Sequence, residues 1–320
     1  MQARSYTMKH YIGIDVSKSC LDIHILPEGI AMQFANSGKG IDSLVEVLFH
    51  YSLPVVVLEA SGGYEKNVKI KLSEKGIEAK TLNPSRVREF AKACGKLAKT
   101  DGIDAQILSL FAEKMEMYPS YQPSSEELIL KDLVQRRRQL TEEIIREKNR
   151  LDKVDHGVIK ENIDSHLAQL KQHLKLMDQA IAACVSKLAS FQEKTKILTS
   201  MPGIGITTAS VLLAELPELG TLENKKIAAL VGVAPMNKES GTMQGYRKIM
   251  GGRLSVRCSL YMAAVVAIRH NKVIKSFYQR LRAKGKPAKV AIIAAMRKMI
   301  TMLNQMLKYQ NYWKETAENN

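Results

Sequence analysis

The stretch that decides the fold reads His10-Tyr11-Ile12-Gly13-Ile14-Asp15-Val16. It is an apolar run of strand length, and a second run, Leu21-Asp22-Ile23-His24-Ile25-Leu26, follows the polar connection Ser17-Lys18-Ser19-Cys20. Two such runs joined by so few residues predict a β-hairpin. Asp15 lies inside the first apolar run, where a carboxylate without a partner is costly to bury. This stretch therefore predicts both the start of a sheet and a candidate functional residue.

After the hairpin, the sequence pattern alternates between strands and helices up to about Ser120. The pattern predicts a third strand, a helix, a strand buried on both faces, a second helix, a further strand and a third helix. In order, these elements cover 31–35, 41–51, 54–60, 64–75, 78–82 and the residues after 83–85. We therefore expect a mixed α/β layer in the first third of the chain.

From about Ser124 to Lys194 the sequence is helical and charged, with a break at Asp155-His156-Gly157 that predicts a helical hairpin. Apolar residues follow a strict 4-3 alternation, the spacing of a coiled-coil seam. They are Ile163, Leu167, Leu170, Leu174, Met177, Ile181, Cys184 and Leu188. A seam closed within one chain and a seam between chains are about equally compatible with this pattern. We predict that it joins protomers, because it offers a full apolar stripe to a partner helix.

The composition bounds the class of protein. The chain has 320 residues, of which 45% are hydrophobic and 25% charged, which excludes a disordered or fibrous protein and predicts roughly two or three domains. No window approaches about 18 consecutive apolar residues, and residues 1–11 lack the apolar stretch of a secretory signal. We therefore expect a cytoplasmic protein with no membrane partner. The 4 cysteines lie far apart, which argues against a zinc site or a disulfide framework.

The net charge of +16 is concentrated in one segment. Between Lys225 and Lys298 the chain carries 17 Lys or Arg and one acid, Glu239, whereas the remaining residues hold 31 of each sign. A solvated helix face usually mixes both signs, so a stretch of one sign indicates a polyanion as partner. An anionic membrane is the alternative, but the segment lacks the aromatic apolar face of an interfacial helix. We expect the partner to be nucleic acid.

The third region, from Ile197 to about Tyr309, is mostly helical. It opens with an apolar helix, the turn Pro202-Gly203-Ile204-Gly205 and a second apolar helix, which is the helix-hairpin-helix pattern. In such a turn, backbone N–H groups at a helix N-terminus are suited to phosphate, so Gly203 and Gly205 are candidate nucleic-acid-binding residues. A plain helical hairpin is the alternative.

Four carboxylates fall where a metal site is readily built. Asp15 lies within a strand, Glu59 ends the buried strand, and Asp101 and Asp104 are three residues apart, on one face if a helix begins there. Clustered carboxylates repel one another unless cations neutralise them, and oxygen ligands suit Mg²⁺ or Mn²⁺. A pair of such ions promotes phosphodiester displacement. Alternatively, Asp104 caps a helix and Glu59 is an ordinary strand-end acid.

A glycine-rich basic segment, residues 238–253, surrounds a single serine, Ser240. Its glycines let the backbone approach a ligand closely, and its cations favour phosphate. We expect nucleic-acid contacts from Arg247, Lys248, Arg253 and Arg257. A serine hydroxyl needs activation, and no histidine is near in sequence, so on these residues alone Ser240 is incidental.

Five ordered motifs carry a resemblance that spans residues 11 to about 307. They are Gly13-Ile14-Asp15-Val16-Ser17-Lys18, Leu58-Glu59-Ala60-Ser61-Gly62-Gly63-Tyr64, Lys99-Thr100-Asp101-Gly102-Ile103-Asp104-Ala105, Met201-Pro202-Gly203-Ile204-Gly205 and Ser240-Gly241 to Gly251-Gly252-Arg253. Together they resemble the DEDD transposases of the insertion-sequence-110 family. The resemblance implies α/β plus all-α architecture: a ribonuclease H-like domain similar to Holliday-junction resolvases (8–122), a coiled-coil domain (123–195) and a transposase domain (196–312).

The resemblance also implies a function. Asp15, Glu59, Asp101 and Asp104 match the family's Mg²⁺-dependent catalytic quartet, and Ser240 matches its nucleophile, which joins DNA through a phosphoserine. The family's partners are element and target DNA and a structured bridge RNA that pairs with both. It also implies a homo-oligomer, a dimer or tetramer, in which a neighbouring protomer's carboxylates complete the centre.

Three other classes of protein share parts of this pattern. An actin-like or sugar-kinase ATPase needs a second ribonuclease H-like domain, for which the heptads and basic helices leave no room. A non-catalytic domesticated relative is disfavoured by four intact acids. A junction resolvase is the nearest enzymatic alternative, and Ser240 distinguishes the two.

Overall fold

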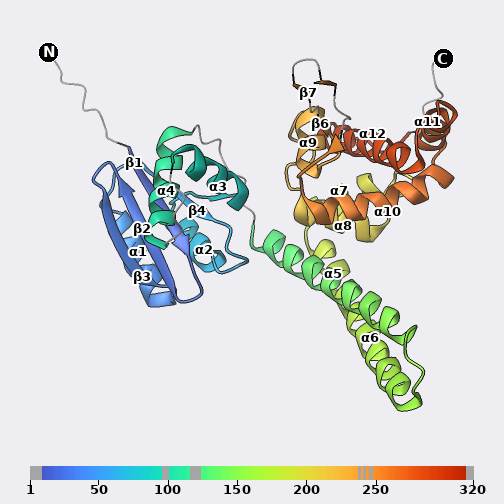
Figure 1. Cartoon of the computed structure of the whole chain (residues 1–320), viewed down its shortest axis with the longest axis horizontal. Coiled ribbons are helices and arrows are strands. Elements are labelled where there is room, and N and C mark those ends of the chain that lie inside the picture. The colour runs from blue at the N-terminus through green and yellow to red at the C-terminus, as the bar shows by residue number, and fades with distance from the viewer. Residues whose placement is uncertain are drawn as a thin grey trace. The chain divides into compact units, whose positions relative to one another are not determined.

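The computed structural model describes residues 9–95, 101–115, 124–236, 239–240, 243–244 and 248–314. The chain divides into two compact units, residues 1–120 and 121–320, which Figure 1 colours from blue to teal and from green to red. The first is a mixed α/β unit and the second is mainly helical, as the sequence predicts.

A five-stranded sheet with the order β3-β2-β1-β4-β5 forms the centre of the first unit. β1, β2 and β3 are antiparallel neighbours, whereas β4 runs parallel to β1 and β5 runs parallel to β4. The predicted hairpin is confirmed, because Tyr11 pairs with Leu26 and Val16 with Leu21. The strands are β1 (His10–Val16), β2 (Cys20–Leu26), β3 (Ile30–Ala35), β4 (Pro54–Glu59) and β5 (Ala79–Leu82).

Helices cover both faces of this sheet (Figure 1). α1 (Gly38–Leu48) and α2 (Lys66–Glu74) share one apolar core with Ile12, Ile14 and Leu58. α3 (Pro84–Ala93) and α4 (Asp101–Lys114) form a second core with Val57. Successive side chains of a strand point to opposite faces. The residues that alternate with Ile12, Ile14 and Leu58 along β1 and β4 therefore lie on the face covered by α3 and α4.

Gly13 lets α4 lie directly on the central strand. A Cβ atom at this position would clash with the carbonyl oxygen of Ala105 and the backbone nitrogen of Ser109, both on α4. On the neighbouring strand, the Nδ1 atom of buried His24 lies at a hydrogen-bonding distance of 2.7 Å from Ser109 Oγ. α4 is thereby held against the face of the sheet to which Gly13 and Asp15 belong.

The second unit begins with a helical hairpin. α5 (Ser125–Leu151) starts at a capping box formed by Ser124 and Glu127, which satisfies backbone N–H groups of its first turn. α6 (Gly157–Lys187) then packs along it. The predicted break at residues 155–157 is confirmed as the point where the hairpin turns.

The seam of α6 is filled by α5 of the same chain. Ile163, Leu167 and Leu170 are at most 7% exposed, and they form one core with Leu140 and Ile144 of α5. The prediction that this seam joins protomers is therefore wrong. The heptad spacing correctly located a buried stripe, but periodicity does not say which helix covers it.

The remaining helices form one core with the base of the hairpin. Leu130 of α5 and Ile181 of α6 are buried in the same cluster as Leu212 and Leu303. The helices on either side of the predicted boundary between residues 195 and 196 therefore share a core and belong to one compact unit, and the division into a coiled-coil and a transposase domain stays a prediction. These helices are α7 (Ala189–Thr199), α8 (Ile206–Glu215), α9 (Asn224–Val231), α10 (Leu254–His270), α11 (Lys272–Ala283) and α12 (Ala288–Lys308).

α12 is the one helix in the described part of the chain that is long and apolar enough to cross a bilayer. Its residues Met299, Ile300 and Leu303 are fully buried in the core of the second unit. This burial is typical of a core helix, whose apolar residues contact neighbouring helices.

Candidate active site and nucleic-acid interface

Asp15 and Glu59 lie next to each other at one edge of the sheet. In the parallel pair of β1 and β4, Gly13 is level with Val57 and Ile14 with Leu58, so Asp15 and Glu59 continue the register. Residues level with one another on neighbouring strands project to the same face, here the face covered by α3 and α4. Both side chains are half-buried. The sheet therefore brings together two predicted site residues that are far apart in sequence.

A third carboxylate, Asp22, extends this row and was not among the predicted site residues. It lies directly opposite Asp15 in the antiparallel register of β1 and β2, and its Oδ1 accepts a 2.8 Å hydrogen bond from Gln33 Nε2. Like charges opposite each other destabilise a sheet, so the row favours a nearby cation. Sequence reasoning missed Asp22 because the pair becomes visible only once the strand register is known.

α4 contributes the other two predicted acids. The helix includes both residues, with Asp101 as its first, so Asp101 and Asp104 are one turn apart and share a face. Asp104 is half-buried and precedes Ala105, which packs on Gly13. The side chain of Asp101 lies outside the described residues.

The acids at this edge of the sheet offer only oxygen donors, the ligands that Mg²⁺ and Mn²⁺ prefer. Among the described side chains, no three histidines, cysteines or carboxylates lie close enough together to hold one metal ion. Mg²⁺, however, keeps several waters and takes only one or two carboxylates from a protein. The neighbouring Asp15 and Glu59 therefore fit such an ion.

Glu65 closes the loop that leaves β4. Its Oε2 atom accepts hydrogen bonds from the backbone N–H of Ser61 at 3.2 Å, from the Ser61 hydroxyl at 2.9 Å and from the backbone N–H of Gly63 at 2.9 Å. Burial acts to raise the pKa of Glu65, but hydrogen bonds to the ionised form outweigh it and the pKa is lowered. The ionised carboxylate thus stabilises the conformation of the loop at Ser61 and Gly63, just after Glu59.

The predicted helix-hairpin-helix is present as α7, a turn and α8. Gly203 has a φ of +107°, and a Cβ there would lie 2.6 Å from the Cβ of Ala267 on α10, so the turn needs glycine to pack on that helix. Gly205 is exposed at the N-cap of α8, and no side chain caps this helix. Gly203 therefore serves packing, whereas Gly205 borders uncapped backbone N–H groups suited to an anion.

The glycine-rich segment after α9 contains short antiparallel pairs instead of an irregular loop. Ser240 pairs with Met243. The side chain of Ser240 and all of Arg247 lie outside the described residues, whereas Lys248 is exposed. The paired strands are β6 (Pro235–Met236) with β9 (Lys248–Ile249), and β7 (Glu239–Ser240) with β8 (Met243–Gln244).

Two arginines expected to bind nucleic acid make contacts within the second unit. Arg253 forms a bidentate ion pair with Glu218, with N···O distances of 2.5 and 2.6 Å, and donates a 2.8 Å hydrogen bond to the carbonyl oxygen of Glu215. Arg257 donates to the carbonyl oxygen of Gly251. Paired guanidinium groups of this kind stabilise the start of α10, so phosphate would have to compete with Glu218 for Arg253.

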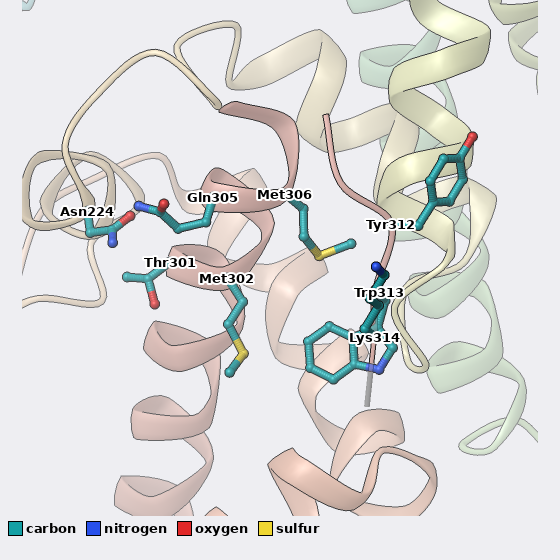
Figure 2. Close-up of a pocket in the computed structure, with 8 residues that line it drawn as sticks. All are labelled: Asn224, Thr301, Met302, Gln305, Met306, Tyr312, Trp313 and Lys314. Atoms are coloured by element: carbon teal, nitrogen blue, oxygen red, sulfur yellow. The ribbon is translucent and has the colours of Figure 1, made fainter. Parts of the chain in front are cut away.

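A separate cavity of about 380 Å³ lies beside α12 in the second unit (Figure 2). Its lining contains no carboxylate, histidine or cysteine, and it therefore lacks the side chains that typically bind a metal ion. Trp313 fastens the C-terminal residues to α7, because its backbone N–H donates a 2.8 Å hydrogen bond to Ser200 Oγ. The lining residues are Asn224, Thr301, Met302, Gln305, Met306, Tyr312, Trp313 and Lys314.

Two family models match this chain, one in each half. A model of DEDD transposases of the IS110 type matches residues 12–155, and a model described as the transposase IS116/IS110/IS902 family matches residues 195–279. The first match includes the four predicted carboxylates, and the second includes Ser240.

Curated relatives point in the same direction. The chain is 27% identical to the pilin gene-inverting protein of Moraxella bovis over 305 residues, which cover 92% of this chain and 94% of that protein. It is 30% identical over 132 residues to an uncharacterised 43.6 kDa protein of insertion element IS110 from Streptomyces coelicolor, covering 41% of this chain and 33% of that protein. A 42 kDa protein of insertion element IS900 from Mycobacterium paratuberculosis is 26% identical over 152 residues, covering 44% of this chain and 37% of that protein.

Proposed function

Because this chain belongs to the IS110 family of transposases, we propose that it cleaves and rejoins the DNA strands of an insertion sequence. The broad activity, that of a DNA transposase or recombinase, follows from the family and from the relatives. The observation that carries the finer proposal is the register of β1 and β4, which makes Asp15 and Glu59 neighbours. We assign the first unit to the ribonuclease H-like fold, supported by its strand order and its mixed pairing.

Asp15, Glu59, Asp101 and Asp104 are the proposed catalytic carboxylates. When bound by them, Mg²⁺ or Mn²⁺ would activate the attacking oxygen and stabilise the charge that develops on the phosphate. The carboxylates would hold this ion at one edge of the sheet. Gly13 supports this role, because it allows α4, which carries two of the acids, to contact β1.

Ser240 is the proposed nucleophile. Its Oγ forms a bond to phosphorus while the bond from phosphorus to a deoxyribose oxygen breaks, so one phosphoester replaces another. The serine gives up its proton, and the departing oxygen takes one up. Attack by a hydroxyl of the second DNA strand reverses these bond changes and releases the serine. Glycine and cationic neighbours, among them Lys248, support the close approach of a phosphate.

We further propose that a structured bridge RNA selects the donor and target DNA, and that the chain acts as a homo-oligomer, a dimer or a tetramer. The basic segment from Lys225 to Lys298 supports partners with phosphate backbones. Because the seam of α6 is closed within the chain, the protomers must meet through other surfaces.

The test is a plasmid that carries the gene with its natural flanking DNA, so that any encoded guide RNA is present. Wild-type protein should produce rejoined junctions that amplification across the ends detects. Asp15→Asn and Ser240→Ala should each abolish the junctions while duplex binding by the purified proteins is kept. Asp164→Asn and Ser165→Ala, exposed matched changes on α6, should retain them.

Two outcomes would overturn parts of this proposal. Junctions formed by Asp15→Asn would remove the carboxylate site. Junctions formed by Ser240→Ala would leave water or a DNA hydroxyl as the nucleophile. For Ser240 a direct readout also exists, because a covalent protein–DNA adduct on denaturing gels should form with wild-type protein and be absent for Ser240→Ala.

Site-specific inversion of a DNA segment is the second candidate. It is favoured by the match to the Moraxella bovis pilin gene-inverting protein, which covers more than nine-tenths of both chains. Inversion uses the same bond changes, so only the product distinguishes the two. Sequencing of the junctions decides: excised or newly inserted elements support transposition, and a reversed segment between fixed ends supports inversion.

A further inference from the structure

We propose that exposed cations of the helical hairpin formed by α11 and α12 bind the backbone of duplex DNA. The inference rests on the proposed function for its choice of DNA. The α11–α12 cationic surface is defined by Lys275, Arg280, Arg282, Lys284, Lys286 and Lys289.

The charges of this surface are not balanced by acids. All six side chains are exposed, and none of them forms an ion pair with a carboxylate in the part of the chain that the structure describes. The sequence contains no acid from residue 240 to residue 314. The hairpin of α5 and α6 differs, because Arg137 pairs there with Asp178. Uncompensated cations repel one another, and a polyanion would relieve that repulsion.

Part of the surface is held in place before a ligand arrives. Two cations contact the Phe277 ring, with Arg280 Cζ 5.6 Å and Lys298 Nζ 4.8 Å from its centroid. Arg282 Nη1 donates a 2.5 Å hydrogen bond to the carbonyl oxygen of Lys286 across the turn between the helices. Cation–π contacts and such bonds restrict side-chain motion, so less entropy is lost on binding.

The surface is joined to the helix-hairpin-helix turn. Asn271, fully buried at the N-cap of α11, accepts a 3.2 Å hydrogen bond from the Ile274 backbone N–H and donates one of 3.5 Å to the carbonyl oxygen of Pro202. Gly203 packs on α10, the helix that precedes α11. The turn and the N-terminal end of the cationic helix α11 are thus parts of one packed body.

The composition of the hairpin favours DNA phosphates over a membrane. Between residues 272 and 298 the large apolar side chains are buried or half-buried except Val290, which is 49% exposed. An interfacial helix would need an exposed apolar face beside its cations. Exposed lysines and arginines suit the regularly spaced charges of a duplex, which they contact without reading its sequence.

The experiment measures binding of the full-length protein to a random-sequence DNA duplex by fluorescence anisotropy at several salt concentrations. The test variant is Lys284→Gln, Lys286→Gln, Lys289→Gln. A matched control, Lys148→Gln, Lys171→Gln, Lys175→Gln, removes three exposed charges from the hairpin of α5 and α6. The charge-preserving variant Lys284→Arg, Lys286→Arg, Lys289→Arg should bind as the wild type does.

The test variant should bind about tenfold more weakly or worse at moderate salt, and the slope of log affinity against log salt should fall by about 2 to 3, since each lost phosphate contact contributes about 0.9. The control should change affinity less than about twofold. Equal binding by wild type and test variant overturns the proposal, as does an equal loss in test variant and control. Loss of binding to an RNA hairpin but not to duplex DNA also overturns it and assigns the surface to RNA.

These readouts separate the surface from the proposed chemistry. Asp15→Asn should bind the duplex normally, because it alters the first unit alone. Failure of the wild type to recombine would refute the proposed function and leave the binding result intact. If the test variant recombines normally and binds the duplex as tightly as the wild type, the proposed DNA-binding surface is refuted and the proposed function is not.

Discussion

The missing side chain of Gly13 sets the distance between α4 and the central strand. Gly13→Ala would drive a Cβ into the backbone of Ala105 and Ser109, and a backbone cannot rotate away as a side chain can. We expect a loss above the about 1–3 kcal/mol typical of overpacking, together with loss of recombination, because Asp101 and Asp104 move with α4. Thermal unfolding of the full-length protein measures the change.

Gly102→Ala is the matched control on α4. Gly102 is exposed, and an added Cβ would meet no atom within 4 Å. Because alanine is a better helix former, this change should raise stability by about 0.5–1 kcal/mol. A Gly13→Ala protein as stable as Gly102→Ala would contradict the packing that brings α4 onto β1.

The carboxylate of Glu65 gives the loop after β4 a dependence on pH. Its pKa is lowered from 4.5 in the folded protein, so its stabilisation is complete above about pH 4.5 and is lost as the pH falls through the lowered value. Glu65→Gln removes this titration. We expect the variant to lose less stability than the wild type between neutral and acidic pH, measured by thermal unfolding at each pH.

Glu46→Gln, an exposed acid on α1, serves as the control for that comparison. It should follow the wild-type pH dependence. If Glu65→Gln and Glu46→Gln have the same acid response, hydrogen bonds from Ser61 and Gly63 do not hold the ionised form.

At the scale of the element, strands were easier to predict than the contacts between helices. β1, β2 and β4 are apolar runs of strand length, and burial on a sheet is what such runs favour. The N-terminal turn of α4 could be predicted only conditionally, because aspartate and glycine are typical of turns and caps. Packing of Ala105 on Gly13 extends the helix to Asp101 despite that preference.

Pairing between elements was harder to predict, because the spacing of apolar residues identifies a buried face but not the element that covers it. The heptads of α6 located a buried stripe, yet the helix that fills it is α5 of the same chain. Asp22 was missed as a neighbour of Asp15 because only the strand register makes the pair visible. In the same way, a count of charges could not reveal that Arg253 is paired with Glu218.

Because the seam of α6 is buried against α5, substitutions within it should lower stability more than substitutions on the exposed face of α6. Leu170 is 4% exposed and packs in the core with Leu140 and Ile144, so Leu170→Ala should lower the free energy of unfolding by about 2–5 kcal/mol. Leu176 on the same helix is 49% exposed, and Leu176→Ala should change it by less than about 0.5 kcal/mol. Denaturant titration measures both.

Sedimentation of the same two variants tests the assignment of the seam. Both should keep the wild-type mass, because the stripe is filled within one chain. A folded Leu170→Ala protein with a lower mass would mean that the seam contacts a second protomer after all.

At the scale of the whole molecule, the proposed catalytic residues are divided between two units. The proposed catalytic carboxylates belong to the first unit and the proposed nucleophile, Ser240, to the second, so the proposed centre requires both. If, as the family resemblance implies, the carboxylates of one protomer meet the serine of another, two inactive variants can complement each other. A mixed oligomer of Asp15→Asn and Ser240→Ala contains one centre with an intact quartet and an intact serine.

Co-expression of Asp15→Asn and Ser240→Ala should therefore restore junctions that neither variant forms alone. The matched control is co-expression of Ser240→Ala with the double variant Asp15→Asn, Ser240→Ala, which leaves no intact serine in any oligomer and should form none. Sequenced junctions, normalised to the amount of each protein, provide the measurement. If the two single variants bind DNA and associate normally but still form no junctions together, the quartet and the serine of one chain must act on the same phosphate, and the shared centre is refuted.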